Sequence, residues 1–239
     1  MPVPDPQNPT SEAGRRRGQR LAADVALVGL LLPVAAIAAA DAVNPQWSWI
    51  EHMASYFVHG RAGWLIPTAG VGFAASAALL IFLVVRLAAA GATGGSPSGE
   101  RLGLWLLAVW AAGMLIAGVF PADPTGHWDR PPSTAAMVHG LGGLTAFLAL
   151  PVAAVLLTRT WRRDPRWQPV ARGLTIAMLV VLAAFAVFVV TWVDVLDGPD
   201  LSVGSWYTVV GLVERAMVWS NTGWLVVAVV GLRRMARDG

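Results

Sequence analysis

The sequence predicts an all-α, polytopic membrane protein: a bundle of six transmembrane helices with both termini in the cytoplasm. Composition is the first observation behind this class. Of the 239 residues, 56% are hydrophobic and only 13% are charged, whereas a soluble domain carries about 25% charged residues. The mean hydropathy is +0.60. The second observation is a series of six apolar runs, each long enough to cross a bilayer. The third is the placement of the arginines at the ends of these runs.

The chain begins with a polar segment, residues 1–20, whose composition and terminal arginines predict a disordered, basic cytoplasmic tail. The first apolar run, 21–43, can span a membrane, because about 20 helical residues cover the hydrocarbon core. A cleaved signal peptide is the alternative, since Ala38–Ala40 offers a small-residue cleavage site. The apolar part is longer than such a segment usually has, which favours the span.

Five further apolar runs follow the first and complete one transmembrane domain over residues 21–235. They occupy residues 62–87, 102–120, 134–158, 170–193 and 207–232. Small residues four positions apart, Gly72 with Ser76 and Gly113 with Ala117, predict close helix packing within the bundle.

The arginines predict the orientation, and the chain has no lysine to dilute the signal. Fourteen of the 17 basic residues fall on the side of the termini. These are Arg15, Arg16, Arg17, Arg20, Arg86, Arg101, Arg159, Arg162, Arg163, Arg166, Arg172, Arg233, Arg234 and Arg237. By the positive-inside rule the termini are cytoplasmic, and the protein is a multi-pass protein of the cell membrane. Because these charges flank spans, they favour orientation signals over nucleic-acid binding, and we expect no nucleic-acid partner.

A short amphipathic helix is predicted in the first outer loop, on the leaflet surface or over the mouth of the bundle. Ser48 and Glu51 have the spacing of a capping box, and Gly60 suits a left-handed helix stop. Its apolar stripe comprises Ile50, Met53, Ala54 and Phe57. Its polar stripe comprises His52, Ser55, Tyr56 and His59.

Polar residues concentrate at the predicted outer end, especially in the island from Phe120 to His139. This island contains Asp123 and two of the four histidines. The four are His52, His59, His127 and His139, which are weak candidates for metal ligands. Zinc accepts imidazole and carboxylate ligands, but no HExxH-type pair is present, so no cofactor is predicted and zinc is the alternative. With no cysteine, the chain has no thiolate nucleophile.

Glu214 and Arg215 are the costliest residues of the last span. A charged side chain near the bilayer centre costs roughly 2.5–3.5 kcal/mol on insertion scales. We therefore expect both side chains to face the bundle and to be paired, with each other or with an aspartate nearer the outer end. The candidates are Asp41, Asp123 and Asp194.

Several short motifs in their order resemble a bacterial membrane family catalogued as domain of unknown function 998. They are Ser55-Tyr56, Gly63-Trp64, Phe120-Pro121-Ala122-Asp123-Pro124, His139-Gly140 and Glu214-Arg215. The likeness covers the chain from the first span to the last. It implies a six-helix integral membrane protein, and it supplies no catalytic residues.

The leading functional hypothesis is a polar pocket at the extracytoplasmic mouth that binds a lipid head group or a small anionic ligand. Its expected walls are Ser55, His59, Asp123, His139, Glu214 and Arg215. An intramembrane enzyme acting on a lipid or isoprenoid is the alternative, either metal-assisted or acid-initiated. Its candidate catalytic residues are His59, Asp123, His139 and Glu214. A small transporter is a third hypothesis.

Overall fold

The computed structural model describes residues 9–89, 97–124, 131–196 and 201–238, and it is built from six long helices. These are α1 (Pro9–Val43), α2 (Leu65–Ala89), α3 (Pro97–Val119), α4 (Thr134–Trp161), α5 (Gln168–Asp194) and α6 (Val210–Asp238). Two short 3-10 helices, η1 (Ala54–His59) and η2 (Pro165–Trp167), lie in the connections. Within the described residues, six helices are long and apolar enough to cross a membrane, so the predicted all-α bundle of six membrane-spanning helices is confirmed.

The helices exceed the predicted spans at several ends. The largest difference is in α1, which begins at Pro9, so residues 9–20 are helical where their composition predicts a disordered tail. Alanine, glutamine and arginine in this stretch favour helix, and the apolar span that follows removes the cost of nucleation.

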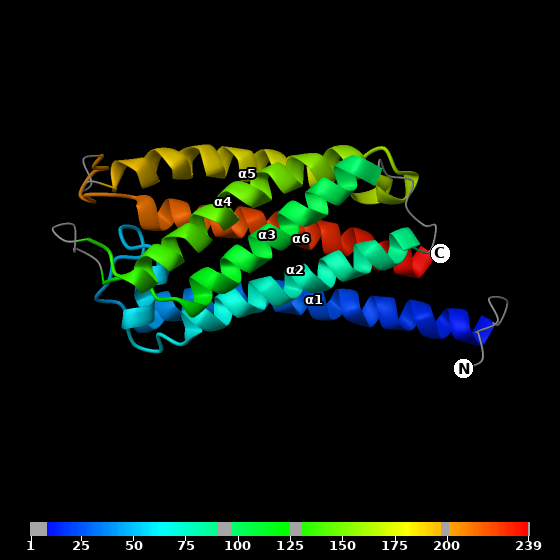
Figure 1. The fold of residues 1–239 in the computed structure, drawn as a ribbon, viewed down its shortest axis with the longest axis horizontal. Coiled ribbons are helices and arrows are strands. Elements are labelled where there is room, and N and C mark those ends of the chain that lie inside the picture. The colour runs from blue at the N-terminus through cyan, green and yellow to red at the C-terminus, as the bar shows by residue number, and fades with distance from the viewer. Residues whose placement is uncertain (1–8, 90–96, 125–130, 197–200, 239) are drawn as a thin grey trace.

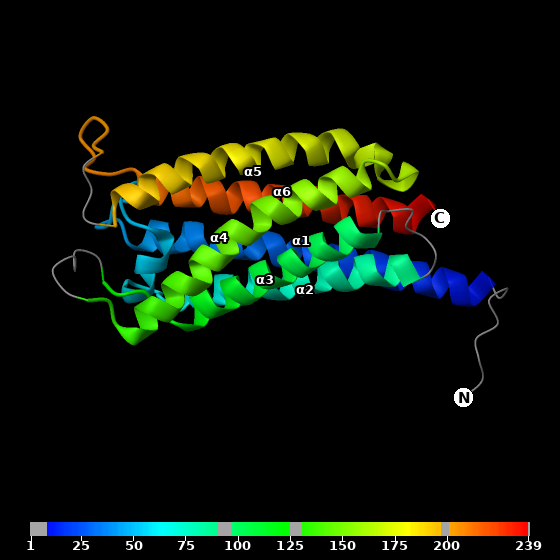
Figure 2. The same cartoon turned by 45° about the horizontal axis from the view of Figure 1, so that its top comes forward.

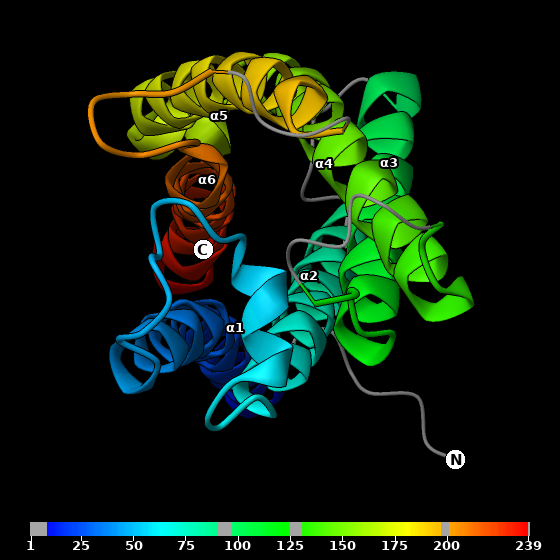
Figure 3. The ribbon, with the colours of Figure 1, turned by 90° about the vertical axis from the view of Figure 1, so that its left-hand side faces the viewer.

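The six helices form a ring in chain order, with α6 completing the ring between α5 and α1 (Figures 1 and 3). The start of α1 and the finish of α6 lie at one end of the bundle, called here the terminal end (Figures 1 and 2). The opposite end carries η1 and is called the η1 end. Figure 3 looks onto this end and shows η1 lying across the bundle beside α1 and α2.

Small residues let neighbouring helices approach closely, as the four-residue spacings predict. A Cβ atom on Gly72 of α2 would lie 2.8 Å from Pro33 Cγ of α1. A Cβ atom on Gly113 of α3 would lie 2.6 Å from the carbonyl oxygen of Gly142 in α4. Larger side chains at these positions would push the helices apart.

Helices α5 and α6 differ most in their surroundings. In the apolar stretch of α5 that could cross a membrane, only 17% is buried inside the protein. In the corresponding stretch of α6, 56% is buried. The outward side chains of α5 are mainly valine and leucine, which suit contact with lipid. Helix α6 has its costly residues inside: Glu214 and Arg215 are both buried. The bundle thus supplies α6 with the shielding that its sequence requires.

The helix in the first loop is shorter than predicted. Ser48 Oγ does accept the backbone N–H of Glu51 at 3.4 Å, but the residues after it form turns, and η1 begins only at Ala54. The Glu51 carboxylate accepts the N–H of Tyr207 instead of returning to the cap residue. Gly60 has φ −93°, so the left-handed stop expected there is wrong. A tertiary contact has replaced the local capping box.

The first loop is held by the beginning of α6. Leu212 N–H donates to the carbonyl of Ile50 at 2.9 Å. Gly211 lies against His52, and a Cβ atom at this glycine would be 2.3 Å from the His52 carbonyl oxygen. Only glycine allows this approach, so residue 211 fixes how closely the loop covers the bundle.

Candidate functional site

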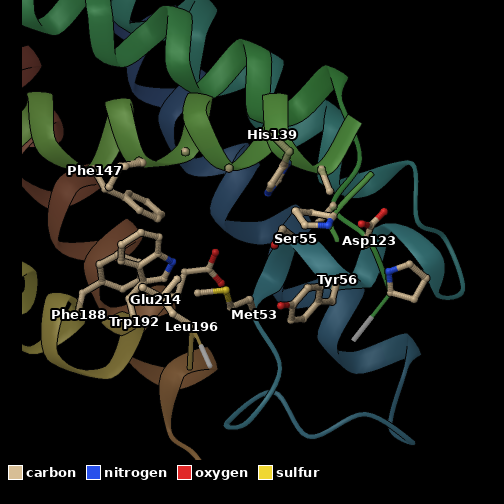
Figure 4. Close-up of a pocket in the computed structure, with 17 residues that line it drawn as sticks. Met53, Ser55, Tyr56, Asp123, His139, Phe147, Phe188, Trp192, Leu196 and Glu214 are labelled. Carbon is tan, nitrogen blue, oxygen red and sulfur yellow. The ribbon is translucent and has the colours of Figure 1, made fainter. Parts of the chain in front are cut away.

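A cavity of about 330 Å³ lies at the η1 end, between η1 and helices α4, α5 and α6. Four of the six side chains expected at a pocket line it: Ser55, Asp123, His139 and Glu214. They come from η1, the segment after α3, α4 and α6, so the fold gathers them from four parts of the chain (Figure 4). His59 and Arg215 are not in its wall.

Glu214 is the buried carboxylate of this cavity. Its residue is 7% exposed, and its side chain extends from α6 into the cavity (Figure 4). One carboxylate oxygen, Oε2, accepts the backbone N–H of Ala54 at the start of η1. A short helix leaves its first amides without internal partners, so Glu214 both lines the cavity and holds η1 in place.

His139 joins the end of α3 to α4. Its Nδ1 lies 2.8 Å from the carbonyl oxygen of Ala117 and 2.9 Å from that of Phe120. Carbonyl oxygens only accept hydrogen bonds, so Nδ1 carries a proton and donates to both. Ala117 lies in the last turn of α3, where helix carbonyls lack partners, and Phe120 directly follows that helix. The ring is thereby fixed with Nε2 as the nitrogen left for chemistry in the cavity.

Asp123 has a structural contact as well as a place in the cavity wall. Its Oδ2 accepts the backbone N–H of Ser133 at 2.7 Å, and Ser133 Oγ in turn accepts the N–H of Ala136 at 3.1 Å. Ser133 is thus the N-cap of α4, as its residue type favours. The hydrogen bond between Asp123 and Ser133 therefore ties the segment after α3 to the start of α4.

His59 and His52 are not in the cavity wall, and each ring lies at hydrogen-bonding distance from a backbone carbonyl. His59 Nε2 donates to the carbonyl of Ala122 at 2.6 Å, which positions the segment that carries Asp123. His52 Nδ1 lies 3.1 Å from the carbonyl oxygen of Ser48, and its ring stacks on Trp47. Both rings therefore organise the loops around the cavity.

No three histidine, aspartate or glutamate side chains converge as metal ligands within the described part of the chain. His127, also considered as a ligand, lies outside the described residues. The structure thus places no zinc ligand set among His52, His59 and His139.

Arg215 is committed to protein acceptors and does not reach the cavity. Its Nε and Nη2 donate to the two carboxylate oxygens of Asp41, the Nε bond being 2.9 Å long. Its Nη1 donates to the carbonyls of His52 and Gly211 at 2.9 and 3.0 Å. The expected pairing with Asp41 is confirmed. Arg215 was expected in the wall of a pocket for a lipid head group or a small anion, but all three of its nitrogens donate to protein acceptors.

Aromatic side chains form the apolar side of the cavity. Phe147 of α4 and Phe188 of α5 meet edge to face with ring centroids 4.7 Å apart, and Trp192 lies beside them (Figure 4). None of these three residues was among the side chains expected at the pocket. A signal was present in α4, where Gly140, Gly143 and Phe147 recur at helical spacing.

The two glycines on this face of α4 leave room for the cavity. A Cβ atom at Gly140 or Gly143 would meet nothing within 4 Å. Gly143 also lines a smaller hollow of about 90 Å³ deeper in the bundle. Ser55, His139, Phe147 and Glu214 border both spaces. The polar groups therefore lie where the two spaces meet.

Tyr56 of η1 supplies a hydroxyl at the cavity wall. Burial raises the pKa of this phenol, and the negative charge of Glu214 raises it further. Tyr56 is therefore a neutral hydrogen-bonding group at physiological pH.

Comparison with known proteins places the chain in a family. No curated protein and no solved structure was found to match this chain. The family model described as "Protein of unknown function (DUF998)" matches residues 27–231. This range runs from the first span to the last and includes every described residue of the cavity wall. The chain therefore belongs to the DUF998 family, as its motifs indicate.

Proposed function

We propose that the protein is a membrane-embedded binding protein that holds the polar end of a small amphipathic molecule in the cavity at the η1 end. The observation that carries this proposal is the two-sided wall. Ser55, His139 and Glu214 form a polar side, and the aromatic rings of Phe147 and Phe188 form an apolar one. Ligand sites typically combine a mostly apolar wall with a few convergent polar groups.

The size of the cavity favours a head group over a whole lipid. Its volume of about 330 Å³ lies at the lower end of the roughly 300–1,000 Å³ typical of ligand pockets. A lipid in this site would place its polar group and first carbons inside, and its tail would follow the apolar surface of α4 and α5.

The arginine distribution supports an extracytoplasmic position for this cavity, with both termini in the cytoplasm. A protease-sensitive tag at the carboxyl end tests the orientation in sealed cells. The tag should be protected until the cells are opened, and cleavage in intact cells would contradict the orientation.

Photo-crosslinking tests the binding proposal. The probe is a decyl amphiphile with a diazirine near its neutral glucoside head group. Crosslinks should fall on the α4 and α5 peptides that carry Phe147 and Phe188. Gly143→Leu should suppress them, because its side chain would grow into the open space of the cavity.

Gly223→Leu is the matched control. Gly223 is an exposed position on α6, its Cβ would also meet nothing within 4 Å, and it is not in the cavity wall. Its crosslinks should equal those of the unaltered protein. Equal labelling in both leucine variants would remove the cavity as the binding site.

Acid-initiated chemistry is a second candidate function, favoured by one observation. Glu214 and Asp123 line the same partly aromatic cavity, beside an imidazole whose Nε2 is not held by the helix carbonyls. A protonated carboxyl there could donate a proton to an allylic hydroxyl, which would leave as water, and the resulting carboxylate would take a proton from the neighbouring carbon of the allylic cation to give a diene. Incubation with farnesol, followed by mass spectrometry, tests this. Loss of one water, abolished in Glu214→Gln, would support it, and unchanged farnesol would exclude it for this substrate.

A further inference from the structure

We propose that the cavity is selective for a cationic, ammonium-type head group over an anionic one. This inference rests on the proposed binding function and names its ligand class. It reverses the charge that the sequence suggests for the ligand, because Arg215, the arginine among the expected wall residues, is not in the wall. The guanidinium of Arg215 is instead buried against Asp41 and two carbonyls.

The charged groups in the described wall are mostly acidic. Its described residues include two carboxylates, Glu214 and Asp123, and one imidazole, His139, and no arginine. A carboxylate attracts a cation at contact distance more strongly at a protein site than in bulk water. The same two charges repel a phosphate or a carboxylate ligand. The wall therefore favours a cationic ligand over an anionic one.

Aromatic rings form another part of this wall. Tyr56, Phe147, Phe188 and Trp192 border the cavity that Glu214 enters. They come from η1, α4 and α5; Phe147, Phe188 and Trp192 lie on one side of the Glu214 carboxylate and Tyr56 on the other (Figure 4). Aromatic rings around an acidic group are the chemistry that recognises alkylated ammonium ions, through attraction of the cation to the ring faces. A chloride or phosphate gains nothing from such faces.

Glu214 has the capacity to accept a donor from a ligand. Ala54 N–H is the donor that the structure gives its Oε2. The carboxylate still borders both the main cavity and the deeper hollow. A primary ammonium would donate to it directly, and a trimethylammonium would pair with it through charge alone.

Competition against the neutral diazirine probe tests the inference. The competitors share a decyl chain and differ in head group: trimethylammonium, glucoside and phosphate. Decyltrimethylammonium should displace the probe at a roughly tenfold lower concentration than decyl phosphate. Tetramethylammonium is added as a tail-free arm. If tetramethylammonium displaces the probe at the same concentration as decyltrimethylammonium, the site is assigned to a free cation. If tetramethylammonium displaces the probe much more weakly, the site is assigned to a lipid head group.

Two variants locate the preference. Glu214→Gln retains an oxygen that can accept from Ala54 N–H, and it should abolish the trimethylammonium preference, so that decyltrimethylammonium and decyl phosphate displace the probe at similar concentrations. Asp123→Asn should reduce the preference and serves as the second variant should the first not fold. Glu100→Gln, an equally buried carboxylate at the terminal end, is the matched control and should change nothing.

The outcomes separate the inference from the function on which it rests. Equal displacement by phosphate and trimethylammonium, with the probe still sensitive to Gly143→Leu, would overturn the charge preference and leave the binding function standing. Labelling that Gly143→Leu does not suppress would overturn both.

Discussion

The two ends of the bundle each bury a glutamate with the same exposure of 7%, yet the surroundings of the two differ. At the terminal end, Glu100 Oε1 accepts the indole N–H of Trp161 at 2.9 Å. Trp161 stacks on Trp167 and Trp224, with ring centroids 4.1 and 5.9 Å away. At the η1 end, Glu214 borders a cavity of about 330 Å³.

This difference separates a structural acid from a candidate functional one. Glu100 lies in the first turn of α3, where the helix dipole favours a negative charge, and a large aromatic stack packs beside it. Glu214 also lies near the start of its helix, which begins at Val210. It differs from Glu100 in bordering a cavity where Glu100 has the stacked indole rings. The packed end stabilises the bundle, and the hollow end retains a charge beside open space.

The largest expected effect is at the packed end. Trp161→Ala should lower the free energy of unfolding by about 5 kcal/mol, because it removes a buried indole, two ring contacts and the partner of Glu100. Phe188→Ala at the cavity should cost clearly less, because one side of that ring borders empty space. Thermal unfolding in detergent compares the two. Equal losses would show that the η1 end is as tightly packed as the terminal end.

The next effect concerns the ion pair that flanks the cavity. Arg215→Met should cost about 3 kcal/mol, because Asp41 and the His52 carbonyl would lose their donors inside the protein. Adding Asp41→Leu should recover part of the loss, because it removes the unpaired charge. Thermal unfolding of the single and double variants measures this. A double variant no more stable than Arg215→Met would mean that Asp41 is compensated by another group.

The sequence predicted the fold better than it predicted the site, for a physical reason. Hydropathy and arginine placement act over whole segments, so the six spans follow from them directly. The clustering of Asp123, His139 and Glu214 followed because membrane burial confines costly side chains to a few places. The cavity wall depends instead on which distant side chains meet. Phe188 and Trp192 look like ordinary lipid-facing residues in the sequence of α5.

Two errors of the sequence predictions, at Arg215 and Glu51, have the same origin. Arg215 was expected to reach a ligand, but Asp41 and two loop carbonyls use its donors. Glu51 was expected to close a capping box, but Tyr207 N–H, 156 positions along the chain, takes its carboxylate. In both cases a partner from a distant segment replaced the local one, and local spacing carries no information about such partners.

Alanine substitutions should change the free energy of unfolding in opposite directions at a packed face of α3 and at the open face of α4, by smaller amounts than the changes above. Gly143→Ala should stabilise the protein by about 0.5–1 kcal/mol, because alanine favours helix and its Cβ meets open space. Gly113→Ala should destabilise it, because its Cβ would lie 2.6 Å from the Gly142 carbonyl oxygen. Melting temperatures of the two variants provide the comparison. Destabilisation by Gly143→Ala would argue against open space at that position.

The smallest effect is spectroscopic and uses the fact that the chain has two tyrosines. In a Tyr207→Phe background, Tyr56 should ionise above the ordinary value of about 10, because burial and the charge of Glu214 both raise its pKa. Adding Glu214→Gln should lower that pKa part of the way, since burial persists. Ultraviolet absorbance follows the titration. No change with Glu214→Gln would place the carboxylate too far from the phenol.

Thiol labelling of Gly143→Cys tests the central claim most directly, because the natural chain contains no cysteine. The measurement is the ratio of labelling rates for a trimethylammonium-ethyl and a sulfonato-ethyl methanethiosulfonate, read by mass. We predict that the thiol reacts with both, that the cationic reagent is roughly tenfold faster, and that Glu214→Gln removes this advantage. A thiol that reacts with neither reagent, or faster with the anionic one, would contradict an open, cation-selective cavity at the η1 end.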